Sequence, residues 1–331
     1  MRVLILSHHD VVAALPPRAC AEAMAAVLAA RARGETYHPL RTVMRAPGAA
    51  GLMGLMPSWR GEHEGSGAAF ALKAICIMPG NPARGLDAHQ GTVTLFDGET
   101  GVPTAILDAS AVTEIRTAAV TAVATGLLAR SDARTLAVLG AGVQGRAHLT
   151  SLAGVRDFEQ VRVYSPTRAH AEALAGHAHL PGVQVSAAAN AEEAVRGADV
   201  VVTATSSREP VFAHAWLKPG AHVNAVGAST PQAREIDTAT VAASALFCDS
   251  RESVRNEAGE FQLAVREGAI TGEEHIRAEL GEVLAGSAPG RRDDGELTLF
   301  RSLGIGVEDL AAAEIAVAAA REQGLGTEVE L

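Results

Sequence analysis

Residues 135–145 decide the fold, and they read Thr135-Leu136-Ala137-Val138-Leu139-Gly140-Ala141-Gly142-Val143-Gln144-Gly145. The first five residues predict a buried strand, and a glycine-rich turn leads from it into a predicted helix. In such a turn the first glycine permits the tight bend, the second lets backbone N–H groups approach a pyrophosphate, and the third lets the helix pack on the strand. Unsatisfied N–H groups at the helix start then favour phosphate. We therefore predict a dinucleotide-binding loop made by Gly140, Gly142, Val143, Gln144 and Gly145.

Strands and helices alternate on both sides of this loop. A long helix is expected at 113–130, and strands are expected at 135–139, 161–164, 183–185, 200–204, 222–226 and 246–248. Strands that alternate with helices predict a parallel, doubly wound sheet. The fold class is therefore α/β, with a Rossmann dinucleotide-binding domain over 116–306.

The region before this domain has a different pattern. A helix at about 17–33 is followed by apolar runs at 36–44, 51–56, 68–78, 92–96 and 102–107, with no helical segment between them. Consecutive strands predict an antiparallel or mixed sheet, and so an α+β domain over 1–115. The Ala-rich helix expected at 307–321 folds back on this domain, so that 307–331 complete it.

Composition limits the partners. Charged residues make up 20% of the chain and the formal net charge is −10, which argues against nucleic acid but leaves room for a small anionic substrate. The cysteines Cys20, Cys76 and Cys248 lie far apart, so we expect no disulfide framework, no metal site and a cytoplasmic setting. No segment is typical of a targeting signal or a membrane span, and we expect no membrane partner.

The strand after the glycine loop bears on the choice of cofactor. A carboxylate about 20 residues after the last glycine would bind the ribose 2′-hydroxyl of NAD. This sequence instead reads Tyr164-Ser165-Pro166-Thr167-Arg168. Ser165, Thr167 and Arg168 can bind a 2′-phosphate, so NADPH is expected, with NADH as the alternative. Arg168 can equally be a solvated helix residue.

Lys73 is unusual because the chain has only two lysines, Lys73 and Lys218. It lies within the apolar run 70–77, which predicts a buried strand. A buried ammonium is costly unless it is paired or functional. The residue alone leaves both readings open: a structural ion pair or an active-site group.

Four motifs resemble the ornithine cyclodeaminase/mu-crystallin family, and most closely its ketimine reductase (Δ1-pyrroline-2-carboxylate reductase-like) branch. The resemblance covers nearly the whole chain. The motifs are Arg116-Thr117-Ala118-Ala119-Val120-Thr121-Ala122, Gly140-Ala141-Gly142-Val143-Gln144, Asn224-Ala225-Val226-Gly227-Ala228-Ser229 and Ser302-Leu303-Gly304.

The resemblance implies a homodimer whose first domain binds substrate and dimerises, with the nicotinamide facing the interdomain cleft. It implies that Arg41 and Arg116 hold a substrate carboxylate, that Lys73 is the active-site lysine, and that Thr92 lies on a strand lining the same site. Because a guanidinium binds a planar carboxylate through two hydrogen bonds, this role suits arginine. Arg116 is expected near the start of its helix, where it does not favour the helix dipole and a local anion would explain it. The alternative for Arg116 is an ordinary arginine on a helix surface. For Arg41 the alternative is also a surface arginine, because nearby Arg45 offers a second match to the family position.

One position departs from the family's name-giving activity. The resemblance implies that ornithine cyclodeaminases carry an Asp where this chain has Ser229, which cannot act as a base; Asp237, eight residues on, is expected to start a helix. We therefore expect NAD(P)H-dependent reduction of a cyclic imine, Δ1-pyrroline-2-carboxylate or Δ1-piperideine-2-carboxylate, to L-proline or L-pipecolate. Lys73 and Ser229 would assist the reaction. The alternatives are ornithine cyclodeamination, alanine-dehydrogenase-like reductive amination and a non-catalytic protein that binds NADPH and a small ligand.

Overall fold

The computed structural model describes residues 1–62 and 67–331, which divide into two compact units. The first contains Met1–Arg116 and Gly304–Leu331, and the second contains Thr117–Leu303. The expected boundaries, after 115 and after 306, differ from these by one residue and by three. Residues 304–306 therefore belong with the first unit.

The first unit is built on a mixed sheet with the strand order β16-β1-β7-β6-β5-β4-β2, and β3 pairs with β4. Strand β1 runs parallel to β7, and the other pairs are antiparallel, which confirms the expected mixed sheet. The strands are β1 (Arg2–Leu6), β2 (Thr36–Tyr37), β3 (Thr42–Met44), β4 (Leu52–Arg60), β5 (Ala69–Ile77), β6 (His89–Asp97), β7 (Pro103–Asp108) and β16 (Thr327–Glu330).

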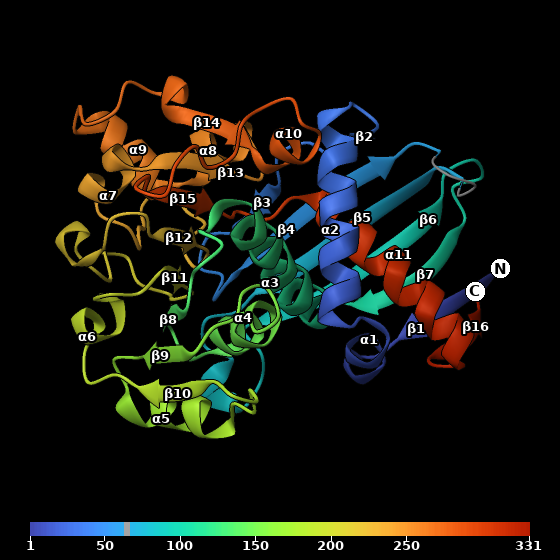
Figure 1. Ribbon diagram of the computed structural model, residues 1–331. Helices are drawn as coiled ribbons and strands as arrows, with labels where there is room; N and C mark the ends of the chain where they lie inside the picture. The colour runs from blue at the N-terminus through green and yellow to red at the C-terminus, as the bar shows by residue number, and fades with distance from the viewer. Residues whose placement is uncertain (63–66) are drawn as a thin grey trace. The chain divides into compact units, whose positions relative to one another are not determined.

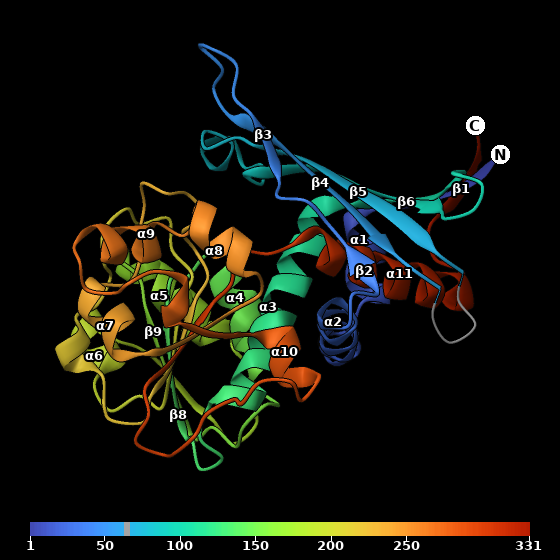
Figure 2. The same cartoon turned by 90° about the horizontal axis from the view of Figure 1, so that it is seen from above.

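Three helices cover one face of this sheet. They are α1 (His8–Ala14), α2 (Pro17–Ala32) and α11 (Gly306–Gln323). Helix α11 packs on β4, β5 and β6, and α2 packs on α11, which confirms that the last helix folds back on the first domain. Figure 2 shows α2 and α11 on the same side of these strands. We call this side of β4, β5 and β6 the helix-covered face and the opposite side the outer face.

The second unit contains a parallel sheet with the strand order β10-β9-β8-β11-β12-β15-β13-β14 (Figure 1). Every pair is parallel, as the Rossmann prediction requires. The strands are β8 (Thr135–Leu139), β9 (Gln160–Tyr164), β10 (Gln184–Ala187), β11 (Val200–Thr203), β12 (His222–Ala225), β13 (Ala245–Cys248), β14 (Ile276–Glu279) and β15 (Thr298–Arg301). Strands β14 and β15 were not expected, because four-residue strands carry too little pattern to be recognised.

Both faces of the parallel sheet are buried, so it is doubly wound. One hydrophobic cluster joins alternate strand residues to α4 and α5, and the other joins the remaining strand residues to α6, α7, α8 and α9. The helices of this unit are α4 (Val143–Leu152), α5 (Arg168–His177), α6 (Ala191–Val195), α7 (Thr238–Ala243), α8 (Arg251–Glu257), α9 (Gly259–Arg266) and α10 (Leu280–Leu284).

Helix α3 (Ala109–Leu128) begins earlier than its predicted start at residue 113. It is long and apolar enough, by composition, to cross a membrane, but 67% of its most apolar window is buried in the structure. Core packing is therefore sufficient to explain its apolar character. The earlier start also places Arg116 at the eighth residue of the helix instead of in its first turn, which corrects the expected position.

Candidate active site

Lys73 is a buried cation in the first unit. It lies on the helix-covered face of β5, between the buried residues Ala71 and Ile75, and is 2% exposed. Its Nζ lies 2.8 Å from both carboxylate oxygens of Asp309 on α11. Burial lowers the pKa of Lys73 to about 8, and the ion pair with Asp309 opposes this shift. Lys73 is thus both ion-paired and able to exchange a proton near neutral pH.

Arg116 reaches the same carboxylate from α3. Its Nε donates to Asp309 Oδ1 at 3.0 Å, and its Nη1 donates to Glu308 Oε2 at 2.7 Å. The side chain is buried, so it is not a surface helix arginine. Glu308 and Asp309 therefore supply at least part of the negative charge that is expected near Arg116.

Glu308 and Asp309 are site residues that the sequence motifs did not predict. Both lie in the first turn of α11 and are almost completely buried. Burial alone would raise the pKa of Asp309, but the charges of Lys73 and Arg116 outweigh it and hold that pKa below its ordinary value. Acidic residues are common at helix starts, so the sequence contained no signal that singled these two out.

Gly304 explains how two arginines approach the start of α11. It has a φ of +75°, and a Cβ there would lie 2.3 Å from Arg116 Nη1, so only glycine fits. Its carbonyl accepts a hydrogen bond of 2.9 Å from Arg41 Nη2. Arg41 also acts electrostatically on Lys73.

We call Arg41, Lys73, Arg116, Glu308 and Asp309 the basic cluster. The structure brings together the three cations that the sequence analysis assigned to substrate binding and catalysis. Three cations and two carboxylates leave a net charge of +1 when all five groups are ionised. A cluster with this charge is suited to one further carboxylate.

Thr92 is not part of the basic cluster. In the ladder between β5 and β6, Val93 pairs with Lys73 and Thr92 pairs with Ala74. Because successive side chains of a strand point to opposite faces, Thr92 lies on the outer face, where it is exposed. Thr92 thus lies on the strand next to that of Lys73 but on its opposite face, and its role in substrate binding stays a prediction.

His89 lies on the same face of β6 as Val93 and so on the same face as Lys73. Its side chain is 46% exposed, and its partial burial lowers the pKa of its imidazole, Asp87 raises it, and the charges of Lys73 and Arg116 lower it further. Because these charges reach the ring, His89 lies near the basic cluster. The strand register agrees, because it places His89 and Lys73 on the same face.

The glycine loop of the second unit fits a dinucleotide pyrophosphate. A Cβ on Gly140 would lie 2.3 Å from the Ala204 carbonyl, and one on Gly145 would lie 2.0 Å from the Gly140 carbonyl. Gly142 is the exposed N-cap of α4 and provides no side-chain cap for the first N–H groups of that helix. In residues 1–62 and 67–331, no atom comes within 4 Å of a Cβ placed on Gly142. Phosphate therefore has access to these N–H groups.

Two further loop residues have side chains near the start of α4. Val143, its first residue, is 40% exposed. Gln144 has a buried Oε1 without a hydrogen-bond partner in the described part of the chain. A buried acceptor of this kind needs a donor, which a bound group can supply.

The residues expected at the adenosine ribose follow β9, the neighbour of β8 in the sheet. Ser165 is half-buried, and Thr167 is the exposed N-cap of α5, whose hydroxyl makes no capping hydrogen bond. Arg168 is exposed and pairs with Glu172, 2.7 Å away. Parallel strands end at one edge of a sheet, so these residues lie at the same edge as the glycine loop.

Glu235 organises the loops after β11 and β12. Its fully buried carboxylate accepts hydrogen bonds from the N–H and hydroxyl of Thr205 at 2.6 Å and from the N–H of Gly227 at 2.6 Å. The second loop continues to Ser229, which is half-buried. Glu235 therefore sets the path of the chain that leads to Ser229, and the sequence contained no signal for this role.

Asp237 is already engaged as the N-cap of α7, as expected. Its carboxylate accepts from the N–H groups of Thr240 at 2.8 Å and His214 at 2.9 Å. Among residues 1–62 and 67–331, no three His, Cys, Asp or Glu side chains are arranged to hold a metal ion.

A doubly wound sheet with a pyrophosphate loop, together with a unit carrying a buried lysine and two arginines, defines the class of nicotinamide-dependent oxidoreductases. The chain belongs to the ornithine cyclodeaminase/mu-crystallin family, whose model matches residues 1–324. This confirms the resemblance and the α/β fold class.

Two curated relatives are reductases that act on cyclic imines. The chain is 38% identical over 282 residues to ketimine reductase mu-crystallin of Mus musculus, covering 85% of each chain. It is 36% identical over 297 residues to Δ1-pyrroline-2-carboxylate reductase of Bacillus cereus, covering 89% of this chain and 90% of the relative. The protein is accordingly a nicotinamide-dependent oxidoreductase.

Two solved structures are similar over nearly the full length. Δ1-Pyrroline-2-carboxylate reductase of Thermococcus litoralis, in complex with NADH and L-proline, superposes with a TM-score of 0.93 at 35% identity, covering 99% of this chain and all of that one. An archaeal alanine dehydrogenase dimer with bound NAD gives a TM-score of 0.92 at 30% identity, covering all of both chains. These neighbours support a nicotinamide cofactor.

Proposed function

We propose that the protein reduces a cyclic ketimine carboxylate, Δ1-pyrroline-2-carboxylate or Δ1-piperideine-2-carboxylate, to L-proline or L-pipecolate. The basic cluster, with its single excess positive charge, is the observation that carries this proposal. Arg41 and Arg116 hold the substrate carboxylate, because guanidinium groups bind carboxylates with fixed geometry. This fixes the orientation of the imine carbon next to the carboxylate.

Lys73 supplies the proton. Reduction of C=N requires one hydride at carbon and one proton at nitrogen, and a bound nicotinamide supplies the hydride. The Lys73 ammonium gives its proton to the imine nitrogen, directly or through water, and regains one from solvent. Its pKa of about 8 suits both steps near neutral pH. Asp309 acts as a positioning residue, because it holds the ammonium from α11.

Ser229 favours reduction over ornithine cyclodeamination. A serine hydroxyl has no ionisable carboxylate to activate the distal amine of ornithine. Asp237 cannot replace it because its carboxylate caps α7. In the reductase Ser229 is suited to hydrogen-bond a water or the substrate.

We infer that NADPH is the preferred cofactor. The segment after β9 offers the hydroxyls of Ser165 and Thr167 and the guanidinium of Arg168, with no acidic residue from 165 to 168. Exchange of Glu172 for a 2′-phosphate as the partner of Arg168 would bind NADPH. NADH remains the alternative, since solved neighbours carry NADH or NAD.

The decisive experiment measures NADPH oxidation with Δ1-pyrroline-2-carboxylate and, on the same preparation, ammonia release from L-ornithine. Rapid oxidation without ornithine turnover supports the proposal and the role of Ser229. Ammonia release without reductase activity overturns it in favour of a cyclodeaminase. A parallel assay with Δ1-piperideine-2-carboxylate determines the ring size.

The alanine-dehydrogenase neighbour makes reductive amination the second candidate function. It predicts NAD(P)H oxidation that requires pyruvate and free ammonia together. Binding of NADPH with no turnover of any of these substrates would instead identify a non-catalytic binding protein.

We also infer a homodimer that forms through the outer face of the first unit. This face carries a cavity of about 370 Å³ lined mainly by apolar and aromatic side chains, including Trp59, Phe70, Leu72 and Phe96. Phe70 is 46% exposed. An exposed apolar patch of this kind is typical of protein interfaces, and the archaeal neighbour is a dimer.

A further inference from the structure

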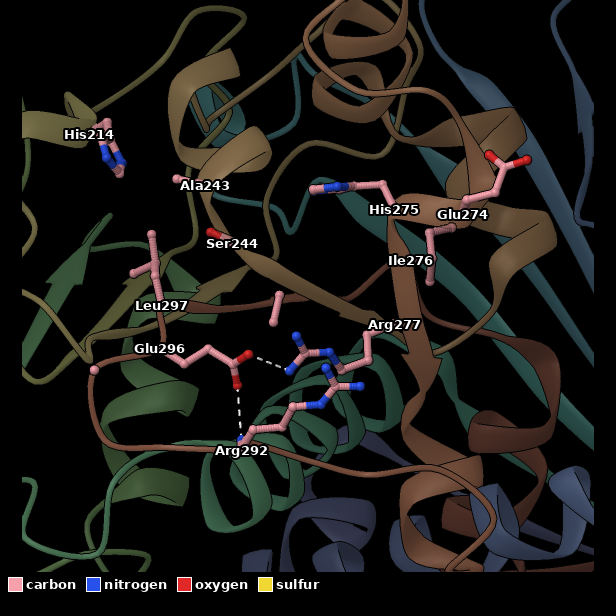
Figure 3. A pocket seen from close by; sticks show the side chains of 12 residues that line it. His214, Ala243, Ser244, Glu274, His275, Ile276, Arg277, Arg292, Glu296 and Leu297 are labelled. Carbon is pink, nitrogen blue, oxygen red and sulfur yellow. Dashed lines mark hydrogen bonds and ion pairs between the residues drawn. The ribbon is translucent and has the colours of Figure 1, made fainter.

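A pocket of about 640 Å³ lies at the amino-terminal edge of the parallel sheet (Figure 3). Its wall includes Ala245 and Ile276, the first residues of β13 and β14, and Leu297, which precedes β15. The volume lies within the usual range of small-ligand sites, about 300–1,000 Å³.

This pocket is separate from the dinucleotide loop. All strands of the sheet are parallel, so the glycine loop after β8 lies at the carboxyl edge and the pocket lies at the opposite edge. A four-residue strand separates the two edges by about 13 Å. The proposed function therefore assigns nothing to the pocket.

The Glu296 carboxylate on the pocket wall contacts the Arg277 side chain and the Arg292 backbone. Glu296 forms an ion pair with Arg277, and its second oxygen accepts the backbone N–H of Arg292 at 3.0 Å. The Arg292 guanidinium has no hydrogen bond or ion pair within residues 1–62 and 67–331. Figure 3 shows both guanidinium groups in the pocket, while the carboxylate of Glu274 points away from them. The four charged side chains of the wall cancel, but Arg277 and Arg292 lie together with Glu296 and apart from Glu274, so this part of the wall has one positive charge in excess.

The segment that carries Arg292 and Glu296 is anchored by Arg291. The Arg291 guanidinium donates to backbone carbonyls that include those of Leu128, at 2.6 Å, and Gly220, at 3.1 Å, as well as to the Thr298 hydroxyl at 2.9 Å. It also donates to the carbonyl of Glu296. These bonds hold the segment in place before a ligand arrives, which lowers the entropic cost of binding.

Histidines line the rest of the pocket. His275 donates from Nε2 to the Val241 carbonyl at 2.7 Å, which fixes its ring. His214 has a buried Nδ1 without a hydrogen-bond partner in the described part of the chain. A buried polar atom with no partner is uncommon and is satisfied when a ligand or water binds.

We propose that this pocket binds a small organic oxyanion, whose carboxylate or phosphate group lies on Arg277 and Arg292. The body of the ligand extends toward His214 and His275. Binding there leaves the dinucleotide loop free, so the protein holds this ligand and its cofactor at the same time.

The test uses the full chain saturated with NADPH and L-proline, so that the phosphate-binding loop and the basic cluster are already filled. Inorganic phosphate and citrate are titrated separately by calorimetry at constant ionic strength. We expect saturable binding of at least one probe at a single site. We expect Arg292→Gln to weaken its Kd by at least about tenfold, since a charge-assisted hydrogen bond is lost.

Arg277→Gln is the second variant, and Arg266→Gln is the matched control. Arg266 is exposed at the end of α9, and within residues 1–62 and 67–331 its side chain bonds only to the Gln262 carbonyl of its own helix. Binding of phosphate alone identifies a phosphoryl ligand, and binding of citrate alone identifies a carboxylate. The proposal is overturned if neither probe binds, or if Arg292→Gln and Arg277→Gln bind as tightly as Arg266→Gln.

Discussion

Lys73 shows how a single residue combines an energetic cost with a chemical use. Removing an ammonium from water costs several kcal/mol, which is why burial lowers its pKa to about 8. Asp309 offsets part of this cost and keeps the group charged at neutral pH. The same carboxylate holds Arg116, so one side chain of α11 positions two cations of the basic cluster.

Replacing Asp309 by the isosteric Asn tests this arrangement. We expect Asp309→Asn to lower kcat for ketimine reduction by about 100-fold, because Lys73 loses its orienting charge. We also expect a loss of about 3 kcal/mol in the free energy of unfolding, from the broken buried ion pair. Steady-state kinetics and thermal unfolding measure the two effects.

Glu322→Gln, an exposed change on the same helix, is the control and should alter neither quantity. NADPH affinity, measured by fluorescence, shows whether the variant still folds. A folded Asp309→Asn variant with wild-type kcat would contradict the positioning role.

The low pKa of Lys73 predicts the pH dependence. Activity should fall as pH rises through about 8, because the neutral amine cannot give a proton. Lys73→Arg keeps its charge over this range, so its alkaline limb should move to higher pH, even though its activity is lower. Identical alkaline limbs in the pH profiles of kcat for both proteins would contradict the assignment.

Above about pH 8, the contribution of Lys73 to stability changes with pH in the opposite direction to its effect on activity. Its folded pKa of about 8 lies below the ordinary value of 10.5, so the unfolded chain binds more protons between these values. Stability attributable to Lys73 therefore rises with pH from about 8 to 10.5. Loss of activity in this window is then not explained by unfolding at Lys73.

At the scale of elements, two glycines at the start of α4 have different roles: Gly142 serves cofactor binding, and Gly145 also serves folding. A Cβ on Gly142 meets no described protein atom within 4 Å, whereas one on Gly145 would lie 2.0 Å from the Gly140 carbonyl. We expect Gly142→Ala to leave the Tm almost unchanged but to weaken NADPH binding by about tenfold or more, because the methyl group obstructs the pyrophosphate.

Gly145→Ala should lower both the Tm and NADPH affinity, because the start of α4 must move away from β8. Thermal unfolding with and without NADPH measures both variants. If Gly142→Ala binds NADPH as tightly as the wild type, the loop does not hold the pyrophosphate in the expected way.

At the scale of the whole molecule, we infer that a second copy covers the apolar outer face of the first unit. If two copies pair through it, Phe70→Asp should convert the dimer to a monomer, because a charge is then buried at the interface. Light scattering after size-exclusion chromatography measures the mass. Val265→Asp, at an exposed apolar residue of the second unit, is the matched control and should remain a dimer.

The sequence by itself determined the doubly wound domain, because periodicity and the glycine loop are local signals. Strand β8 spans the predicted residues 135–139, and helix α11 begins one residue before its predicted start. Asp237 caps α7, as expected. The family motifs also led to Lys73, Arg41 and Arg116.

Only the tertiary structure decided what these cations contact. Glu308 and Asp309 lie nearly 200 residues after Arg116, and they meet it because α11 returns to the sheet of the first unit. The register between β5 and β6 placed Thr92 on the outer face and His89 on the helix-covered face. Such pairings depend on long-range packing, in which a shift of one residue exchanges the two faces, and no local pattern of residues encodes it.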